Sequence, residues 1–322
     1  MSNAFSTSGS KKLTFKIATR GSPLALWQAR WVQENILEQF PELSVELLIL
    51  KTSGDRIQDR PLSEVGGKGL FIKELETALL DGRADMAVHS MKDVTGFFPE
   101  GLEISVIAKR EDPGDAWLCP KYGSIDDFPQ GGVVGTSSLR RASQLKHYRP
   151  DLQIRSIRGN VVTRLRKLDE GEVDATILAV AGLKRSELEE RITEVLPMEW
   201  MLPAIGQGAI GIETRIGDQQ TLSRIQHLND QITWDCLLAE RTLLTELEGN
   251  CQIPLAGYCI LNGDELFLRA LIGDPEGKSV LRYEARAARQ DSVMLGWEAA
   301  QWLLKNGAEE ILKKVNSAKN KL

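Results

Sequence analysis

Arginine, lysine, serine and aspartate side chains recur together in four short polar segments of the sequence. The segments are Arg20, Ser90 to Asp93, Ser137 to Arg141, and Arg158. Arginine presents a planar fork of N–H donors that matches a carboxylate, and lysine adds a point charge. A helix that begins at the paired serines would add free backbone N–H groups, which favour an anion. These residue types predict a site for a small molecule with several carboxylates, rather than for a nucleotide.

Positive charge is concentrated in one segment, although the chain as a whole is acidic. The 322 residues include 40 Lys and Arg against 45 Asp and Glu, for a formal net charge of -5. Between Gly131 and Glu170, nine cations and three anions give a local net charge of +6. An anion must therefore be bound by this local cluster. Nucleic acid is not favoured as a partner, because base stacking needs aromatic residues among the cations and Tyr148 is the only one there.

Strands and helices alternate around the polar segments, as is typical of a parallel sheet. Apolar periodicity predicts strands over Leu13–Thr19, Val45–Leu50 and Asp85–Val88, with helices over Leu24–Phe40 and Gly69–Leu80. The pattern restarts with strands over Gly132–Val134, Leu152–Ile157 and Ala175–Val180, a helix start at Thr136 to Ser138, and a helix over Val161–Glu170. Each polar segment follows the carboxyl end of a predicted strand, where open α/β sheets bind ligands. We therefore expect two α/β domains and one cleft.

The pattern changes after Gln231 to a long helix, three short strands and a final helical stretch. The strands are predicted over Tyr258–Leu261, Leu266–Ile272 and Ser279–Glu284, and the last helix over Asp291–Val315. This indicates a small α+β domain with an antiparallel sheet. We expect domain 1 over residues 13–108 and 205–228, domain 2 over 109–204, domain 3 over 229–322, and a disordered tail over 1–12.

Three glycine-rich or apolar segments have competing interpretations. Gly273 to Ser279 resembles a phosphate loop but has one residue too few between its glycines, which favours a hairpin turn. Gly66-Gly67-Lys68-Gly69 lacks the Ser or Thr of a phosphate loop, so Ile57 to Gly67 is interpreted as a mobile lid. Ile177 to Leu183 is interpreted as a buried strand rather than a membrane-surface patch.

Composition limits the class of protein. Hydrophobic residues make up 42%, charged residues 26% and aromatic residues 6% of the chain, which is typical of a globular protein. The longest apolar stretch, Ala175 to Leu183, is too short to span a membrane, and the first sixteen residues show no secretory signal. These features predict a cytoplasmic protein. The four cysteines form no Cys-x-x-Cys pair, which disfavours a zinc site or a disulfide framework.

Eight segments, in order along the chain, match one family. They are Ile17-Ala-Thr-Arg-Gly-Ser-Pro-Leu-Ala-Leu-Trp-Gln28, Gly66-Gly-Lys-Gly-Leu-Phe71, His89-Ser-Met-Lys-Asp-Val94, Val134-Gly-Thr-Ser-Ser-Leu-Arg-Arg141, Arg158-Gly-Asn160, Leu178-Ala-Val-Ala-Gly-Leu-Lys-Arg185, Gly206-Gln-Gly208 and Glu248-Gly-Asn-Cys-Gln-Ile-Pro254. Together they resemble the hydroxymethylbilane synthases, also called porphobilinogen deaminases. The resemblance runs from about Lys16 to Lys314, with Thr95 and Asn250 departing from the pattern.

The resemblance implies a fold, an activity and a cofactor. The implied fold has three domains, of which the first two resemble type II periplasmic binding proteins. The implied activity is a deaminating transfer that joins four porphobilinogen units head to tail and releases 1-hydroxymethylbilane by hydrolysis, in heme and other tetrapyrrole synthesis. The implied cofactor is a dipyrromethane joined through a thioether to Cys251. The family also implies a monomer.

The resemblance and the chemistry of the residues together assign the site. Asp93, with Lys92 and Arg20, is the catalytic candidate, because a carboxylate near a pyrrole N–H stabilises the cation left when ammonia departs. The candidates for binding the cofactor are Cys251, Ser22, Lys92, Asp93, Thr136, Ser137, Ser138, Arg140, Arg141, Arg158 and Gly159. The candidates for binding substrate are Arg20, Ser22, Arg158, Arg164, Arg185, Gln207 and Gly208, and those for the lid are Gly66, Gly67 and Lys68.

Two alternatives stay open from the residues alone. A solute-binding module would share the two α/β domains and the arginine cleft, but it would normally carry an export signal. It would also need neither the third domain nor Cys251. That cysteine could instead be a small buried hydrophobic residue, although its position between Gly249 and Pro254 favours access. Intact mass distinguishes a synthase from a solute-binding module, because only the synthase would carry a covalent pyrrole adduct.

Overall fold

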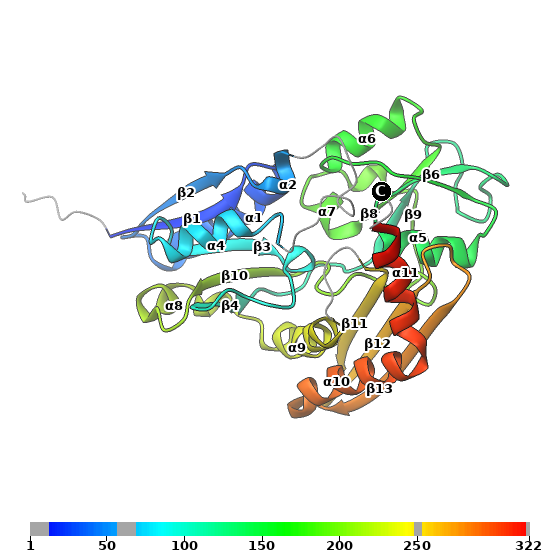
Figure 1. Ribbon diagram of the computed structural model, residues 1–322. Coiled ribbons are helices and arrows are strands. Elements are labelled where there is room, and N and C mark those ends of the chain that lie inside the picture. The colour runs from blue at the N-terminus through cyan, green and yellow to red at the C-terminus, as the bar shows by residue number, and fades with distance from the viewer. Residues whose placement is uncertain (1–12, 57–68, 248–252, 320–322) are drawn as a thin grey trace, which may run out of the picture.

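The structure is a computed structural model that describes residues 13–56, 69–247 and 253–319. It contains three sheets, and Figure 1 shows the first on the left, the second at the upper right and the third at the lower right. Three sequence predictions lie outside the described residues: the tail over 1–12, the lid over 57–67 with its candidates Gly66, Gly67 and the adjacent Lys68, and the attachment residue Cys251.

The first sheet has the strand order β2-β1-β3-β10-β4, with β1 parallel to β2 and β3, and with β10 antiparallel to both of its neighbours. Its strands are β1 (Thr14–Arg20), β2 (Ser44–Leu50), β3 (Met86–Ser90), β4 (Leu102–Ile107) and β10 (Ile210–Arg215). The associated helices are α1 (Pro23–Gln39), α2 (Ser53–Arg56), α4 (Lys73–Leu80), α8 (Gln219–Ile225) and the 3-10 turns η1 (Met91–Asp93) and η3 (Gln226–Leu228). Ile17, Val32 and Ile212 form part of a fully buried core between the sheet and α1.

The second sheet repeats this arrangement, with the order β7-β6-β8-β5-β9. Strand β6 is parallel to β7 and β8, and β5 is antiparallel to β8 and β9. The strands are β5 (Asp115–Leu118), β6 (Val133–Gly135), β7 (Gln153–Arg155), β8 (Ala175–Ala179) and β9 (Glu194–Val195). The helices are α5 (Leu139–Tyr148), α6 (Val161–Asp169), α7 (Val180–Lys184) and the 3-10 turn η2 (Glu189–Arg191). Strand β5 follows β4 and strand β10 follows β9, so the chain crosses between the two sheets twice.

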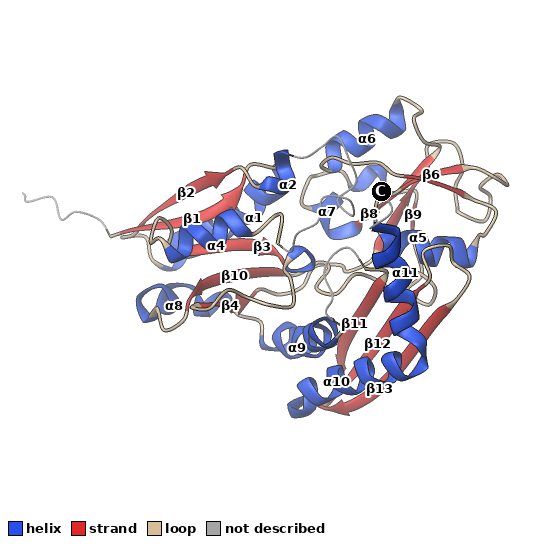
Figure 2. Ribbon diagram, in the orientation of Figure 1, coloured by secondary structure: helices blue, strands red, loops and turns tan. Residues whose placement is uncertain are grey.

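The third sheet is an antiparallel meander of β11 (Leu255–Asn262), β12 (Glu265–Gly273) and β13 (Val280–Ala288). Figure 2 shows α9 and α10 against it, and their contacts with β11, β12 and β13 bury Leu243, Leu268 and Leu303. The helices are α9 (Gln231–Glu246), α10 (Ser292–Leu303), α11 (Glu309–Lys319), the 3-10 turn η4 (Arg289–Asp291) and the π segment η5 (Leu304–Ala308).

These sheets confirm the predicted fold class of two α/β domains and a small α+β unit with an antiparallel sheet. They also correct in part the expectation of a parallel sheet, because an antiparallel strand enters each of the first two sheets. The segment Gly273 to Ser279 is a hairpin turn between β12 and β13, as predicted. It packs against α5, where His147 Nδ1 lies 3.1 Å from the carbonyl oxygen of Gly277.

Two other predictions about secondary structure were wrong in part. Ile177 to Leu183 is not one buried strand, because β8 ends at Ala179 and the helix α7 begins at Val180. In a short apolar run that no polar residue interrupts, periodicity cannot distinguish a buried strand from a buried helix. The helix predicted from Gly69 begins only at Lys73, after a turn in which Ile72 N–H donates to the Gly69 carbonyl oxygen at 3.0 Å.

The final helical stretch is interrupted rather than continuous. Helix α10 ends at Leu303 and α11 begins at Glu309, with the π segment η5 between them. Gly307 has φ 111° in that segment, a backbone conformation that is strained for any other residue. No helix in the described part of the chain has the length and apolar character needed to cross a lipid bilayer.

A cluster of buried titratable side chains lies in the first domain behind the end of β3. His89 Nε2 lies 2.8 Å from Glu213 Oε2, and both side chains are buried. Glu76 on α4 is buried beside them. Burial and the negative charge of Glu213 raise the pKa of Glu76 to about 7, against smaller opposite effects of His89 and Lys73. Folding is therefore favoured when Glu76 is protonated.

We predict that Glu76→Gln stabilises the protein at pH 8 and has little effect at pH 5. The raised pKa means that the parent loses stability as the pH rises from about 4.5 through about 7, whereas glutamine stays neutral. The difference in free energy of unfolding at pH 8 should reach about 3 kcal/mol at most, from the size of the shift. Thermal melting across this pH range measures it, with the exposed Glu38→Gln as control. A stabilisation that did not depend on pH would contradict the prediction.

Candidate active site

The predicted polar segments meet along the carboxyl ends of the parallel strands. Arg20 is the last residue of β1, and Ser90 is the last residue of β3. The turn η1, which follows β3 at once, carries Lys92 and Asp93. In the second domain, Ser137 follows β6 by two residues and Arg158 follows β7 by three. The structure thus brings together segments that are separated by more than a hundred residues of sequence.

Arg20 is held by a carboxylate that the sequence did not single out. Its Nη2 lies 2.5 Å from Asp55 Oδ1, and its guanidinium stacks 4.2 Å from the centroid of the Phe71 ring. Arg20 and Thr52 donate hydrogen bonds that hold the pKa of Asp55 below its usual value, although burial alone would raise it. The second carboxylate near Arg20 is Asp93, whose Oδ2 lies 4.0 Å from Arg20 Nη1.

Asp93 keeps its acceptor oxygens available. Its side chain is 35% exposed, and it accepts no hydrogen bond from another residue in the described ranges. The distance of 4.0 Å to Arg20 is an ion pair without a hydrogen bond. Because Asp55 takes the short contact with Arg20, Asp93 can accept a hydrogen bond from a ligand.

Arg140 and Arg141 share one fully buried carboxylate. Arg140 Nη1 donates to Asp115 Oδ2 at 2.5 Å, and Arg141 Nη2 donates to Asp115 Oδ1 at 2.7 Å. Although burial alone would raise the pKa of Asp115, the two arginines hold it far below its usual value. Each arginine also donates to a backbone carbonyl, that of Leu202 or of Ile177. Both guanidiniums keep further N–H donors, and Arg140 Nε is buried with no partner among the described residues.

Gln207 and Gly208 belong to the segment that returns the chain to the first sheet. Gln207 Nε2 donates to Asp115 Oδ1 at 3.0 Å and to the carbonyl oxygen of Pro113 at 2.7 Å. A Cβ atom at Gly208 would lie 2.3 Å from the carbonyl oxygen of Glu111, so only glycine fits there. Both residues are therefore supports of the connection between the domains, with Gln207 in contact with the arginine pair through Asp115.

Lys92 and Arg164 lie within the electrostatic reach of this pair. Desolvation, followed by the positive charge of Arg141, lowers the pKa of Lys92 to about 8. Desolvation and the charges of Arg141 and Arg158 lower the pKa of Arg164 to about 10, with Asp93 opposing them. Cations therefore outnumber anions where these residues meet. The excess positive charge favours a ligand with several carboxylates.

The hydroxyl groups of the site shape the loops that carry the charges. Ser22 Oγ caps α1 by accepting from Ala25 N–H, and the Ser138 side chain caps α5 by accepting from Arg141 N–H. Ser137 Oγ donates to the carbonyl oxygen of Ile157 at 2.6 Å, joining the loops after β6 and β7. Two further predicted residues act through similar bonds: Thr136 Oγ1 accepts from Ser138 N–H, and the Gly159 carbonyl oxygen accepts from Arg164 Nε.

Arg185 is the one predicted cation that stands apart from this group in the described structure. Its Nη2 donates to the carbonyl oxygen of Gly208 at 2.8 Å, and its guanidinium lies 5.6 Å from the centroid of Trp27. Burial lowers the pKa of Arg185 to about 10, and the only charge that opposes this effect is that of Glu111. Arg185 thus lies apart from the clustered cations.

The sequence reasoning missed Asp55 and Asp115, the two carboxylates that position arginines. Asp115 begins a buried strand, Asp-Ala-Trp-Leu, and an acidic residue beside such an apolar run requires a buried cation. This requirement is the sequence signal from which the ion pair of Asp115 could have been predicted. Asp55 lies in a short polar turn, Thr-Ser-Gly-Asp, which carries no comparable signal.

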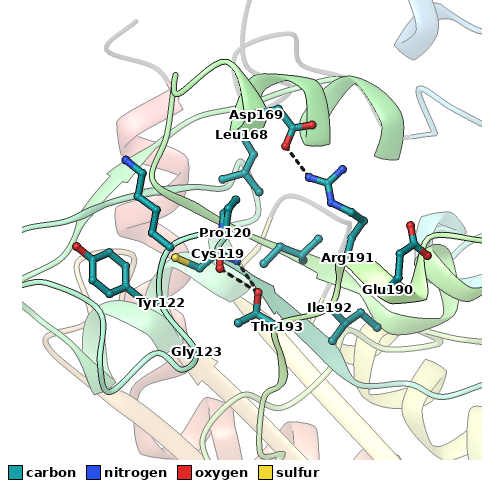
Figure 3. A pocket seen from close by; sticks show the side chains of 12 residues that line it. Cys119, Pro120, Tyr122, Gly123, Leu168, Asp169, Glu190, Arg191, Ile192 and Thr193 are labelled. Atoms are coloured by element: carbon teal, nitrogen blue, oxygen red, sulfur yellow. Dashed lines mark hydrogen bonds and ion pairs between the residues drawn. The ribbon is translucent and has the colours of Figure 1, made fainter.

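A cavity of about 610 Å³ lies elsewhere in the second domain and contains none of the predicted site residues. Figure 3 shows Arg191 and Asp169 directed toward one another across it, and their atoms Nη2 and Oδ1 are 2.6 Å apart. Thr193 Oγ1 bonds the backbone of Cys119 on another wall. Two of the polar contacts that line this cavity are thus made within its own wall. Among the described residues, no group of His, Cys, Asp and Glu side chains is arranged to hold a metal ion.

Two family models match the chain in succession. The first, described as "Porphobilinogen deaminase, dipyromethane cofactor binding domain", matches residues 15–223. The second, described as "Porphobilinogen deaminase, C-terminal domain", matches residues 234–305. The first match contains the polar segments from Arg20 to Arg185, and the second contains most of α9 and the three-stranded sheet.

Several solved structures of bacterial proteins match this chain over part of its length. A putative methionine-binding lipoprotein from Bacillus subtilis is 12% identical, with a TM-score of 0.42, and the match covers 67% of this chain and 89% of that chain. A double mutant of the BvgS VFT2 domain from Bordetella pertussis is 17% identical, with a TM-score of 0.43 and coverage of 72% and 93%. A periplasmic substrate-binding protein from Coxiella burnetii is 12% identical, with a TM-score of 0.42 and coverage of 66% and 91%.

We predict that Asp115→Asn destabilises the protein by about 3–5 kcal/mol, because it leaves two buried guanidiniums without a counter-ion. The matched control is Asp169→Asn, which removes the exposed ion pair with Arg191 and should cost less than about 1 kcal/mol. Urea unfolding measures both variants. Equal and small effects would show that the buried arrangement of Asp115, Arg140 and Arg141 does not support the fold.

Proposed function

The chain belongs to the porphobilinogen deaminase family, and from this we propose that it acts as a hydroxymethylbilane synthase. Such an enzyme joins four porphobilinogen units head to tail, with loss of ammonia from each, and releases 1-hydroxymethylbilane by hydrolysis. The family is one of transferases, and its first domain binds a dipyrromethane cofactor. The observation that carries the proposal is the position of Asp93, a carboxylate with available oxygens beside Arg20 and the clustered cations.

The charges of the described cleft fit a dipyrromethane. Each pyrrole ring carries an acetate and a propionate, and the cleft has an excess of cations around Lys92 and Arg164. The buried Arg140 Nε, which has no partner among the described residues, is a donor that such a carboxylate can satisfy. We assign the binding of the cofactor to Cys251, Ser22, Lys92, Asp93, Thr136, Ser137, Ser138, Arg140, Arg141, Arg158 and Gly159. When bound, the cofactor supplies a pyrrole carbon as the nucleophile.

The residues assigned to the incoming porphobilinogen are Arg20, Ser22, Arg158, Arg164, Arg185, Gln207 and Gly208. Arginine side chains orient its acetate and propionate by bidentate pairing. Gln207 and Gly208 act through backbone positioning, since Gln207 bonds Asp115 and Gly208 accepts from Arg185. Fixing the substrate at both carboxylates leaves its aminomethyl group and pyrrole N–H as the parts that face the reacting residues.

Asp93 is the proposed catalytic carboxylate. When the bond between the aminomethyl carbon and nitrogen of porphobilinogen breaks, the electron pair leaves with ammonia and the pyrrole becomes electron-poor. A carboxylate that accepts from the pyrrole N–H stabilises this positive charge. A bond then forms between the methylene carbon that ammonia has left and a pyrrole carbon of the bound chain, and Asp93 is the proposed acceptor of the proton that this pyrrole carbon loses. Arg20 and Lys92 place positive charge beside Asp93, with Arg20 Nη1 4.0 Å from Asp93 Oδ2.

We predict that the purified protein is heavier than its sequence by a two-pyrrole adduct on Cys251. Its thioether should survive reducing agents, unlike a disulfide. Cys119, Cys236 and Cys259 are buried free thiols and serve as internal controls in peptide mapping. Cys251→Ala should have the mass of the sequence alone and no synthase activity. An active protein with unmodified Cys251, or an adduct on another cysteine, would refute the assignment.

We predict that Asp93→Asn folds normally but reacts about a hundredfold more slowly, because it loses a preorganised charge worth on the order of 3 kcal/mol in the transition state. Single-turnover rates of the cofactor-bearing variant and thermal melting separate catalysis from stability. Asp81→Asn, on an exposed pair with Arg83, is the matched control and should match the parent in both measurements. A stable Asp93→Asn protein that reacts within a fewfold of the parent would exclude this role.

A further inference from the structure

A hollow of about 490 Å³, here named the side pocket, lies between residues 23–34 of α1 and the first turn of α6. Its walls come from both α/β domains and include Trp27 and Trp31 on α1, Val161 and Val162 on α6, and Arg185 after α7. This volume lies within the roughly 300–1,000 Å³ that is typical of small-molecule sites. Figure 1 shows α7 on the side of the second domain that faces the first.

The side pocket adjoins the cleft but contains only one of its assigned residues. Ser22, assigned to the cleft, is followed directly by Pro23 of the pocket wall, and Gly159 is followed by Asn160 of the opposite wall. Arg185 is common to the cleft and the pocket. A ligand that outgrows the cleft can therefore enter the side pocket without leaving the protein surface.

The lining of the side pocket suits a pyrrole ring with carboxylate substituents. Trp27 and Val162 present apolar surface and are 36% and 55% exposed. Arg185 lies over the Trp27 ring, and the exposed Arg30 forms no ion pair with any residue that the structure describes. The two guanidiniums can pair with an acetate and a propionate. Glu34 and Glu187 also line the pocket, and their carboxylates can accept from a pyrrole N–H.

The charge balance of the cleft explains why a second site is needed. If the proposed function holds, the bound chain grows from two pyrrole rings to six, and each ring adds two carboxylates. Six rings carry twelve carboxylates, whereas the cations assigned to the cofactor and the substrate are seven: Arg20, Lys92, Arg140, Arg141, Arg158, Arg164 and Arg185. These cations cannot pair with every carboxylate of the longer chain. We infer that the side pocket binds a pyrrole unit of the elongating chain once the cleft is filled.

The test introduces a negative charge at Val162 in the cofactor-bearing protein. Val162 is the second residue of α6, where an acidic residue favours the helix, so Val162→Glu should fold. Val162→Gln is the matched neutral control. Intact mass, recorded at short times after mixing with porphobilinogen, follows each added unit as a separate mass step. In Val162→Glu, the first addition should stay within about twofold of the parent, and the third and fourth should slow about fivefold by charge repulsion.

Hydrogen exchange gives a second measurement that does not depend on turnover. The backbone amides of Val161 and Val162 lie at the start of α6, and they should become protected only in complexes that carry two or more added units. Equal slowing of all four additions in Val162→Glu, or equal behaviour of the Glu and Gln variants, would overturn the side-pocket proposal. Unchanged exchange at these amides in the longer complexes would also overturn it. If the parent itself shows no stepwise mass increase, the proposed function has failed instead.

Discussion

One buried carboxylate, that of Asp115, fixes the residues on which the site depends. Its side chain is fully buried, and it accepts hydrogen bonds from Arg140, Arg141 and Gln207. Removing a carboxylate from water costs several kcal/mol, so the arrangement is stable only when the charge is fully paired. Because the arginines begin α5 and Gln207 lies in the return to the first sheet, this interaction joins the second domain to the crossover. The arginines are consequently oriented before any ligand binds, which lowers the entropic cost of binding.

The same network extends into the third domain. Arg110 Nε donates to the carbonyl oxygen of Gln207 at 2.8 Å, and Arg110 Nη1 donates to Glu240 Oε1 at 2.5 Å. Glu240, fully buried on α9, also accepts from the backbone N–H groups of Gly206 and Cys259 at 2.8 Å each. Two buried carboxylates thus hold the crossings between all three sheets. The third sheet is therefore a structural partner of the cleft, although it contributes none of the clustered cations.

The sequence predicted those site residues whose position follows from a local pattern of residue types. Arg20, Lys92 and Asp93 were predicted at the ends of parallel strands because periodicity identified β1 and β3, and Ser138 was predicted at a helix start by its type. Strands β5 and β10 were not predicted, because each is antiparallel to partners far away in the sequence and no local pattern identifies such pairing. Asp115 was missed for the same reason: its role is visible only when β5 lies beside α5.

Pairing of the other charges leaves Asp93 as the available carboxylate of the cleft. Asp55 takes the short contacts with Arg20, and Asp115 takes those with Arg140 and Arg141. Without Asp55, Arg20 would lose its close counter-ion, and Asp93 is the next carboxylate within reach of Arg20. A carboxylate that neutralises a guanidinium at close range is a weaker acceptor for a ligand. The two positioning carboxylates therefore have a chemical consequence as well as a structural one: they leave the Asp93 oxygens without a hydrogen-bond donor among the residues that the structure describes.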